Sequence, residues 1–458
     1  MNVYVKIEVL ARELEGRLLL GLVAAERGHR VLLGDLRSLL SHRLWLPPGI
    51  YHDKGLRPTE RRLALLSLMK ARGFVITSQD EEHGLLQADY EAFARARYSD
   101  ATLASADAVL AWGPHDGAHL RARYPSAAER IRVTGSPRTD TWRNELRSRH
   151  AGVNLPGIDP SRPYVLFASN SAALNRNPFW VLLRDMRPSY FARDSGGAFA
   201  ETALYRELAF QMAYLPHVID MLRALPEEIP GLQVIVRPHP TEEPGAWSDV
   251  LGDVEGLRVD SSGTLGAWLH GAAALVHNGS TSALEAAVGG TPLLSLQPVA
   301  KDERSFADRF GRTVRTTEEL VAALQHVLAA GGAGAGGAEE RALLAARLTA
   351  LDGRLAADRI VDVWEELDPG GRLSRPFVPA RALLAATTHR RIGALQARSR
   401  QLISGERPPQ PMRLAEKFPP FAMGDVHRLV EGFRLTLGRF DTVEVRRVGR
   451  RMLELRSR

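Results

Sequence analysis

The stretches VIVRPHP (Val234–Pro240) and LVHNGSTSALEAAVGGTPLL (Leu275–Leu294) decide the fold of this chain. Each begins as a short apolar, β-branched run and then breaks into polar residues. A buried parallel strand ends in this way at the carboxyl edge of an open α/β sheet. An apolar helical pattern follows the second strand and stops at Gly289-Gly290. Because ligands bind outside that edge of a sheet, the two stretches predict a ligand site.

The simplest ligand for this edge is a phosphate or diphosphate. A helix that begins after a strand attracts anions, because its first N–H groups are unpaired and its dipole is positive there. We expect the phosphate to bind to Asn278, Gly279 and the hydroxyl groups of Ser280, Thr281 and Ser282. Arg237 and His239, followed by Pro240, end the other strand and could reach the same phosphate. The alternative is that Arg-Pro-His-Pro is a rigid strand exit whose histidine caps backbone.

Composition places the chain among globular enzymes. Its 458 residues are 45% hydrophobic, which is enough for a large core in two or three domains. It has no cysteine, so disulfides and thiol catalysis are excluded and a reducing compartment is expected. No apolar run approaches the roughly 20 residues that span a bilayer, and no signal peptide is recognisable, so we expect a cytoplasmic protein. The net charge of +7 suits anionic substrates or a membrane face better than nucleic acid.

Strands and helices alternate through about the first 330 residues, which predicts parallel sheets built from βα units. We predict an α/β protein of two Rossmann-like domains, residues 1–150 and 151–366, whose parallel sheets face a central cleft. An arginine-rich helical appendage, residues 367–458, follows them. The predicted strands are Val3–Val9, Arg30–Gly34, Phe74–Thr77, Ala108–Trp112 and Ile131–Gly135 in the first sheet, and Tyr164–Ala168, Leu232–Val236, Leu257–Val259, Ala273–His277 and Leu293–Leu296 in the second. The predicted helices include Ala11–Arg27, Glu60–Arg72, Phe199–Leu225, Glu339–Glu366 and Ala380–Leu402.

Two α/β domains around a cleft are the architecture of GT-B glycosyltransferases and of sugar-nucleotide 2-epimerases. Over about the first 300 residues the chain resembles the bacterial surface carbohydrate biosynthesis protein family. The resemblance lies in VKIEVLARELEGRLLLGLVAAERGHRVLLGD (Val5–Asp35), PPGIYHDKG, DEEHG, AWGPHD, VTGSPRTD, FASNSAALNRN, RPHP and HNGSTSALEAAVGGTPLL. It implies a GT-B-like transferase in the assembly of capsule, lipopolysaccharide or another cell-surface glycan.

Bacterial sialyltransferases and transferases that use Kdo share three short motifs with this family. The motifs are a paired acid with a glycine, an HP pair, and a pair of hydroxyl residues on the helix after a strand. They are matched here by DEE (80–82) with Gly84, by His239-Pro240 and by Ser280–Ser282. His83 stands between the acids and the glycine, which leaves open which glutamate is the base. The resemblance implies a CMP-activated acidic sugar, sialic acid-like or Kdo-like, as the donor.

Glu81 and Glu82 follow a predicted strand, so we expect them at the carboxyl edge of the first sheet. Clustered carboxylates raise one another's pKa, and such a carboxylate can accept a proton from an attacking hydroxyl group. We predict that one of them is the catalytic base and that His239 is the second catalytic residue, which helps to protonate the leaving group. The alternative is a solvated acidic loop.

Each of the other candidate binding residues can also be explained by a purely structural role. In two-domain nucleotide-sugar enzymes a glutamate at the position of Glu285 contacts the ribose, yet Ser282-Ala-Leu-Glu285 is also a capping box. Asn170 and Ser171 end the first strand of the second domain, where they line the nucleotide site or form a polar turn. The predicted acceptor-binding residues, whose alternative is a solvated surface, are Arg12, Glu13 and Lys54.

No metal and no cofactor is expected beyond a nucleotide-sugar co-substrate. The chain lacks Asp-x-Asp, GxGxxG after its first strand and GxxxxGK[ST], so a metal-diphosphate clamp, nicotinamide chemistry and a P-loop lack support. We therefore predict a metal-independent glycosyltransferase that acts on a glycan or glycolipid acceptor. The alternatives are a CDP-glycerol or CDP-ribitol polyol-phosphate transferase, a UDP-sugar 2-epimerase, and a non-catalytic scaffold held at the inner membrane face by its basic C-terminal region.

Overall fold

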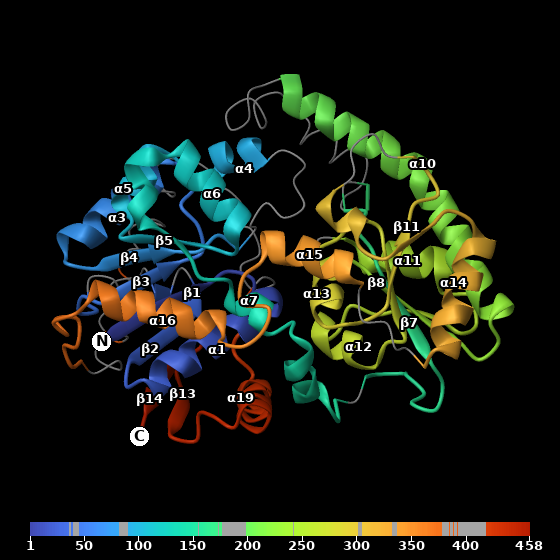
Figure 1. Cartoon of the computed structure of the whole chain (residues 1–458). Coiled ribbons are helices and arrows are strands. Elements are labelled where there is room, and N and C mark those ends of the chain that lie inside the picture. Colours follow the sequence, from blue (N-terminus) through green and yellow to red (C-terminus); the bar gives the residue numbers. More distant parts are fainter. Residues whose placement is uncertain are drawn as a thin grey trace. The chain divides into compact units, whose positions relative to one another are not determined.

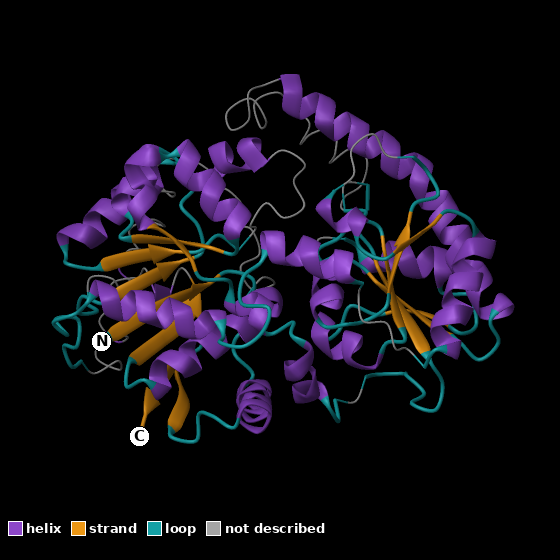
Figure 2. Cartoon of the chain, viewed as in Figure 1, coloured by secondary structure: helices purple, strands orange, loops and turns teal. Residues whose placement is uncertain are grey.

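A computed structural model describes residues 1–35, 38–39, 45–81, 90–153, 155–172, 174–175, 198–240, 242–300, 305–331, 337–377, 384, 388, 392 and 418–458. By its internal contacts the chain divides into two compact units. Unit 1 comprises Met1–His83, Arg97–Arg149 and Ala346–Arg458, and unit 2 comprises Gly84–Ala96 and His150–Ala345. Each unit contains a sheet with helices packed against it (Figures 1 and 2). The predicted α/β class is confirmed.

Unit 1 is built on an eight-stranded sheet in the order β13-β14-β2-β1-β3-β4-β5-β6. The six N-terminal strands are parallel, and β14 pairs antiparallel with both β2 and β13. The short strand β3 and the β13–β14 hairpin were not predicted. The strands are β1 (Asn2–Ile7), β2 (Arg30–Asp35), β3 (Ile50–Asp53), β4 (Val75–Ser78), β5 (Ala108–Ala111), β6 (Ile131–Val133), β13 (Val443–Gly449) and β14 (Met452–Ser457).

Helix α1 (Leu10–Glu26) is enclosed on several sides. It packs against α7 (Pro137–Asp140), α16 (Ala356–Leu367), α19 (Met423–Leu437) and β14, as well as against β1 and β2. Its leucines from Leu18 to Leu22 are fully buried. A helix that is apolar all round must be covered all round, and the C-terminal segment of the chain completes that cover. The other helices of unit 1 include α3 (Glu60–Ala71), α5 (Asp100–Ser105) and α6 (Pro114–Arg123).

Asp140 and Arg143 hold the returning C-terminal chain against unit 1. The Asp140 carboxylate accepts hydrogen bonds of 2.9 Å from the amides of Ala356 and Ala357, at the start of α16, and one of 3.0 Å from Arg143. Arg143 also donates to the carbonyl oxygen of Gly353 at 2.8 Å. The segment before α16 is therefore bound through its backbone. For this reason the predicted helix Glu339–Glu366 is two helices, α15 (Ala338–Arg347) and α16.

The units differ from the predicted domain boundaries. The sequence places the second domain at 151–366 and a separate appendage at 367–458, whereas by contacts Ala346–Arg458 belongs with the N-terminal unit. The predicted appendage helix Ala380–Leu402 lies outside the described residues, apart from Leu384, Thr388 and Ile392. Of the helices that the structure describes, none combines the length and the apolar character needed to cross a membrane.

Unit 2 has a six-stranded parallel sheet in the order β12-β11-β10-β7-β8-β9. Its strands are β7 (Tyr164–Ala168), β8 (Gln233–Arg237), β9 (Leu257–Val259), β10 (Ala274–His277), β11 (Leu293–Leu296) and β12 (Arg312–Val314). The first five match the prediction within one residue at each end, and β12 was not predicted. Its helices include α10 (Ala198–Glu228), α11 (Pro244–Leu251), α12 (Leu265–Gly271), α13 (Ser282–Val288) and α14 (Thr317–Ala329).

The strand orders create one topological switch point in each unit. In unit 2 the chain runs outward from β7 to β8 and β9, and then returns to the other side of β7 with β10. In unit 1 it runs from β1 to β2 and returns to the other side of β1 with β3. A crevice forms at the carboxyl ends of two strands whose connections leave in opposite directions, and ligands of open α/β sheets bind there.

Asp140 makes the stability of unit 1 depend on pH. Burial raises the pKa of this carboxyl from 3.8 to about 6, despite the neighbouring Arg143 and the two amides. A raised native pKa contributes stability below the unfolded value of 3.8, and this stability is lost as the pH rises through about 6. We expect the stability of the wild type relative to Asp140→Asn to fall by up to roughly 3 kcal/mol over that interval. Urea unfolding of both proteins between about pH 4 and pH 8 measures it.

Asp362, on α16, is the control for this titration. Although its burial acts in the opposite direction, hydrogen bonds from Arg27 and Arg354 lower the pKa of this carboxyl. Asp362→Asn should therefore remove stability that is present near neutral pH and lost on acidification. Parallel pH profiles of Asp140→Asn and the wild type would show that Asp140 does not titrate in this range.

Candidate functional site

The switch point of unit 2 brings together three of the predicted nucleotide-binding loops. Ser169 to Ser171 follow β7, Asn278 to Ser282 follow β10, and the Arg-Pro-His-Pro turn follows β8 on the other side of β7. The amide of Asn170 donates to the carbonyl oxygen of Gly279 at 3.3 Å, which links the loops of the two central strands. The sequence motifs that lie far apart in the chain therefore meet at one edge.

His277 and Gly279 shape the loop after β10. The Gly279 amide donates to His277 Nδ1 at 3.2 Å, so the proton of the neutral ring is on Nε2, which donates to the Phe310 carbonyl oxygen at 2.9 Å. Burial lowers the pKa of His277 and keeps the ring neutral. Gly279 has a φ of +87°, and a Cβ there would lie 2.6 Å from Asp308 Oδ1. Only glycine fits this turn without strain.

Three side-chain oxygens at this edge are buried without a hydrogen-bond partner among the described residues. They are Ser171 Oγ, Asn278 Oδ1 and Ser280 Oγ. Ser171 is completely buried and Ser280 is 4% exposed. Buried polar atoms in proteins are nearly always hydrogen-bonded, so a group of orphaned oxygens marks a position where water or a ligand completes them.

Glu242 fixes the position of this edge, and the sequence did not single it out. Its carboxylate accepts hydrogen bonds from Ser169 Oγ at 3.0 Å, the Ser171 amide at 2.6 Å and Trp247 Nε1 at 2.8 Å. Burial raises the pKa of Glu242, against the effect of these hydrogen bonds. The Glu242 amide in turn donates to the carbonyl oxygen of His239 at 2.8 Å. Glu242 thereby ties the turn that carries His239 to the loop after β7.

Arg237 contributes to the structure of unit 2. Its two terminal nitrogens donate to the carbonyl oxygens of Ser262 and Gly263, both at 2.7 Å, in the loop after β9. Burial lowers the pKa of its guanidinium, and the charges of Asp260 and Glu285 oppose that effect. Contact with a phosphate stays a prediction for Arg237.

The structural alternative for Ser282 and Glu285 is not formed. Helix α13 begins at Ser282 after Thr281, whose side chain makes no capping hydrogen bond. Ser282 is therefore the first helical residue, and the predicted capping box with Glu285 is absent. Thr281, Ser282 and Glu285 are all partly exposed, as are His239 and Arg237, whereas Pro240 is exposed. Their predicted roles toward a nucleotide remain predictions.

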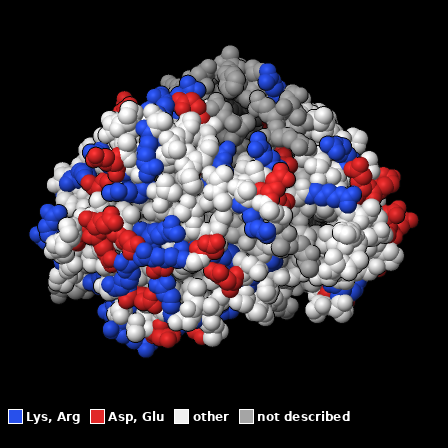
Figure 3. Space-filling view, in the orientation of Figure 1, with Lys and Arg blue, Asp and Glu red and all other residues white. Residues whose placement is uncertain are grey.

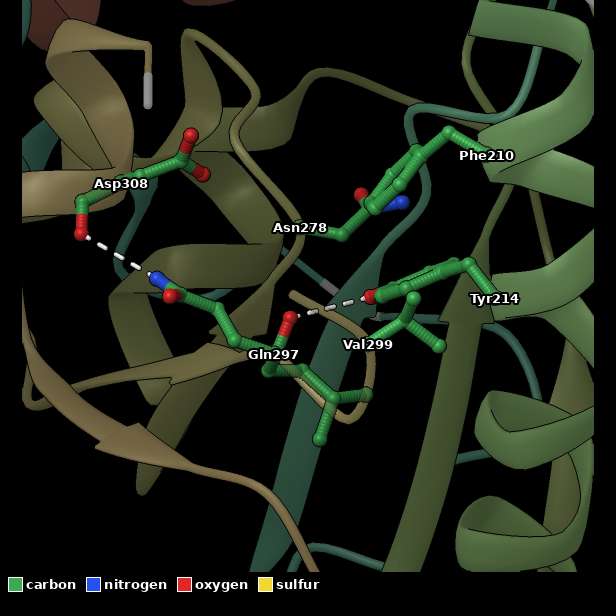
Figure 4. Close-up of a pocket in the computed structure, with 7 residues that line it drawn as sticks. Phe210, Tyr214, Asn278, Gln297, Val299 and Asp308 are labelled. Carbon is green, nitrogen blue, oxygen red and sulfur yellow. Dashed lines mark hydrogen bonds between the residues drawn. The ribbon is translucent and has the colours of Figure 1, made fainter. Parts of the chain in front are cut away.

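A small hollow lies beside Asn278 at the carboxyl ends of β10 and β11. Figure 4 shows Asn278, from the loop after β10, among the residues that line the hollow together with Phe210 and Tyr214, which lie one turn apart on α10. Tyr214 Oη donates to the Leu296 carbonyl oxygen at 3.2 Å, and Gln297 Nε2 donates to the Asp308 carbonyl oxygen at 3.4 Å. The sequence signal for this hollow was the spacing of Phe210 and Tyr214 on α10. The hollow is lined by Phe210, Tyr214, Asn278, Leu296, Gln297, Val299 and Asp308.

The predicted acceptor-binding residues meet at the switch point of unit 1. Lys54 follows β3, and its ammonium lies 2.9 Å from Glu8 Oε2 and 3.6 Å from Glu13 Oε1. Arg12 Nη2 lies 3.5 Å from the same Glu13 oxygen. Burial lowers the pKa of Lys54, but Glu13 and Glu8 outweigh it and raise the pKa above its usual value. Lys54 is therefore a permanent cation.

Glu81 is buried after β4 in an ion pair with Arg17. Arg17 Nη2 lies 2.6 Å from Glu81 Oε1, and the two side chains are 2% and 3% exposed. The Glu81 amide donates to the carbonyl oxygen of Lys54 at 3.3 Å, which places Glu81 beside the β3 end. Its neighbour Asp80 is held by Arg97 through two hydrogen bonds of 2.8 Å. Glu82, His83 and Gly84 lie outside the described residues.

Among the described residues, no group of three or more histidine, aspartate or glutamate side chains is arranged to hold a metal ion. The expectation of metal-independent chemistry stays a prediction.

Comparisons with known proteins bear on the fold. No protein-family model matches the chain, and no curated protein sequence matches it. A putative UDP-N-acetylglucosamine 2-epimerase from Listeria monocytogenes has a similar structure, with a TM-score of 0.50, 13% identity, and coverage of 82% of this chain and 99% of that chain. At this identity the likeness shows the fold alone. The predicted GT-B-like fold is confirmed.

Two further solved structures are similar at lower TM-scores. The UDP-GlcNAc 2-epimerase from Neisseria meningitidis bound to UDP-GlcNAc has a TM-score of 0.48 and 10% identity over 80% of this chain and all of that chain. The wall teichoic acid polymerase TagF has a TM-score of 0.46 and 12% identity over 80% of this chain and 88% of that chain. The predicted relation to sialyltransferases and Kdo transferases stays a prediction.

Gly279→Ala should disrupt the loop after β10. The substitution places a methyl group against the Asp308 carboxylate and forces alanine into a left-handed conformation. Gly290→Ala is the matched control, because Gly290 also has a positive φ, of +72°, but a Cβ there meets nothing within 4 Å. The backbone strain common to both is about 1 kcal/mol. We expect the free energy of unfolding, measured by denaturant titration, to fall further for Gly279→Ala than for Gly290→Ala. Equal decreases in the two variants would contradict a steric clash between the new methyl group and Asp308.

Proposed function

We propose that the protein is a nucleotide-sugar-dependent glycosyltransferase of cell-surface glycan assembly. In this proposal unit 2 binds the nucleotide and unit 1 supplies the base and the acceptor site. The observation that supports it most is the set of buried, unpartnered oxygens of Ser171, Asn278 and Ser280 at the switch point of unit 2. These are the residues that the sequence motifs assign to a nucleotide sugar.

The nucleotide site follows from the chemistry of these groups. The hydroxyl groups of Ser171 and Ser280 can donate to phosphate oxygens and would then no longer be unpaired. Thr281 and Ser282 can add donors, since capping does not occupy Thr281. The small hollow beside Asn278 carries an aromatic ring and two amide side chains, and in this proposal the nucleobase binds along this edge of the sheet. Glu285 reaches the ribose and His239 the phosphate.

In the proposed reaction an acceptor hydroxyl oxygen attacks the anomeric carbon of the donor sugar. Glu81 takes the hydroxyl proton, a new carbon–oxygen bond forms, and the bond from the anomeric carbon to the phosphate oxygen breaks. Its electron pair leaves with the nucleotide, whose developing charge His239 stabilises by hydrogen bonding or protonation. Arg12, Glu13 and Lys54 bind the acceptor.

The donor that we propose is a CMP-activated acidic sugar, on the basis of the sequence resemblance to HP-motif transferases. The same site suits a CDP-polyol, in which attack falls on phosphorus. It also suits a UDP-sugar undergoing 2-epimerisation, the reaction named for the Listeria protein that shares the fold. Nucleotide preference separates these three.

Membrane contact through the C-terminal region stays a secondary proposal. Two of its arginines are paired across the β13–β14 hairpin, Arg446 with Glu454 and Arg456 with Glu444. Figure 3 shows basic and acidic side chains interspersed on one face of the molecule. A non-catalytic scaffold would bind anionic vesicles through this region and would bind no nucleotide.

Thermal stabilisation by nucleotides tests the proposed function. A ligand present at 100 times its dissociation constant stabilises the native state by about 2.7 kcal/mol. We expect CMP or CDP to raise the melting temperature of the wild type, and His239→Ala and Ser280→Ala to lose most of that shift. A response to uridine nucleotides alone would favour a UDP-sugar transferase or a UDP-sugar 2-epimerase. If no nucleotide raised the melting temperature, the proposal would be abandoned.

Glu81→Gln tests the base. The substitution keeps the shape of the side chain but removes the proton acceptor, and removal of a general base lowers turnover by roughly 100-fold or more. We expect transfer to fall while the nucleotide-dependent thermal shift stays at the wild-type value, because the nucleotide binds in unit 2. Unchanged turnover would move the base to Glu82.

A further inference from the structure

Arg17 is a buried cation that the fold leaves without hydrogen bonds. It is 2% exposed, and its three nitrogens Nε, Nη1 and Nη2 have no hydrogen-bond partner among the described residues. Its contact with Glu81, at 2.6 Å, is an ion pair without hydrogen-bond alignment. A guanidinium has five N–H donors, and leaving them unmet in the interior is unfavourable. These donors are therefore candidates for contact with a group that the described residues do not supply.

Three residues at the ends of β3 and β4, His52, Gln79 and Glu81, each have a buried side-chain atom without a hydrogen-bond partner among the described residues. Each is also anchored by contacts of its own. His52 Nδ1 is hydrogen-bonded to Thr77 Oγ1 at 3.0 Å, and the other ring nitrogen, Nε2, has no partner among the described residues. Gln79 Nε2 donates to the Gly135 carbonyl oxygen at 2.7 Å, and its amide oxygen Oε1 has no such partner. Glu81 Oε1 forms the ion pair with Arg17, and Glu81 Oε2 has no hydrogen-bond partner among the described residues.

These side chains belong to one neighbourhood of unit 1. His52 and Thr77 are paired across β3 and β4, and the Gln79 amide donates to the backbone of the next β3 residue, Asp53. Arg17, on α1, is close enough to His52 to lower its pKa, after burial, which is the larger cause. The neutral His52 ring has one nitrogen that donates and one that accepts.

A second arginine with a buried side chain, Arg149, has hydrogen bonds from all three of its nitrogens and serves as a comparison for Arg17. The side chain of Arg149 is also 2% exposed, and Arg149 Nη2 lies 2.6 Å from Glu15 on the same helix α1. Its three nitrogens all donate, two to Glu15 and one to the carbonyl oxygen of Leu146 at 2.7 Å. The two arginines match in burial and ion-pair distance and differ in their hydrogen bonds.

The unpartnered atoms around Arg17 are a mixture of donors and acceptors. An anion would meet the Arg17 donors but would face the Glu81 carboxylate, and a cation would face Arg17. A hydroxyl group both donates and accepts, so it can bond to Arg17 and to Glu81 or Gln79 at once. We propose that unit 1 binds the hydroxyl groups of a neutral sugar or polyol through Arg17, His52, Gln79 and Glu81.

That this ligand is the acceptor rests on the proposed function, but its binding does not. With a glycosyl donor in unit 2, a hydroxyl held between Arg17 and Glu81 Oε2 is the nucleophile, and its proton passes to Glu81. Arg17 is then a substrate-binding residue that the sequence motifs did not include.

Saturation-transfer-difference NMR on the full chain tests the site. The neutral probes are N-acetylglucosamine and ribitol, and the anionic probe is glucuronate. We expect the neutral probes to bind the wild type and to lose at least about tenfold in affinity in Arg17→Gln, as removal of a hydrogen bond from a charged group does. Arg149→Gln, the matched control, should bind both neutral probes as the wild type does, although it is less stable.

A double variant keeps the test valid if Arg17→Gln alone fails to fold. Arg17→Gln/Glu81→Gln leaves no unpaired charge in the interior, so it should fold and still lose the neutral probes. Wild-type affinity in the double variant, tighter binding of glucuronate than of the neutral probes, or no binding of any probe to the wild type would each overturn the site. In the last case the unpartnered atoms hold water only.

The nucleotide melting shifts are measured on the same samples. If the neutral probes bind through Arg17 but no nucleotide stabilises the protein, the proposed function fails and the hydroxyl site remains. If nucleotides stabilise the protein but Arg17→Gln leaves probe binding unchanged, the hydroxyl site fails alone.

Discussion

The burial of helix α1 is the constraint on which unit 1 depends. Its leucines are enclosed by the sheet, whose strands β1, β2 and β14 it contacts, and by the helices α7, α16 and α19. Its buried leucines lie from Leu18 onward, so its polar residues near the sheet edge lie in its first half. Its N-terminal turns start at the carboxyl end of β1, next to the switch point, and therefore carry Arg12, Glu13 and Arg17 there. The same packing explains why the chain returns to unit 1 at its C-terminus: without α16 and the final hairpin, α1 would expose apolar surface.

The two units treat buried polar groups in two ways. At structural joints most of them are satisfied, as with Asp140 at the start of α16 and Arg149 beside Glu15, although Arg143 Nε has no partner among the described residues. At both switch points it leaves several unsatisfied, including Arg17 in unit 1 and Ser280 in unit 2. Because an unpaired buried polar group is unfavourable by about 1–3 kcal/mol, such groups are retained where a ligand completes them. Thr291 Oγ1, just before β11, is also buried without a partner among the described residues, so the unpartnered atoms mark these edges only together with the topology.

The sequence predicted the central parallel strands well because a run such as YVLFA (164–168) has one physical explanation, a strand buried on both faces. It missed β3 because IYHD (50–53) ends in a buried histidine and aspartate, whose partners Thr77 and Lys6 come from other strands. Glu242 and Arg17 were missed for the same reason. A charged residue in a turn or on a helix looks solvated until the packing that buries it is known. The hydroxyl and HP motifs were found because they adjoin strand ends, and their chemistry remains to be tested.

The ion pair of Arg17 and Glu81 bears on the chemistry that unit 1 performs. A buried ion pair is often no more stabilising than apolar residues of similar volume, because desolvation of both charges offsets their attraction. Stability alone therefore gives little reason for this pair. Its reason must lie in what the charges do at the sheet edge. A 2-epimerase acts on the sugar of its own nucleotide and needs no separate hydroxyl ligand, whereas a transferase must bind an acceptor hydroxyl and take its proton. Donors from Arg17 beside an unpartnered oxygen of Glu81 would meet the second requirement, which is the one that the proposed function makes.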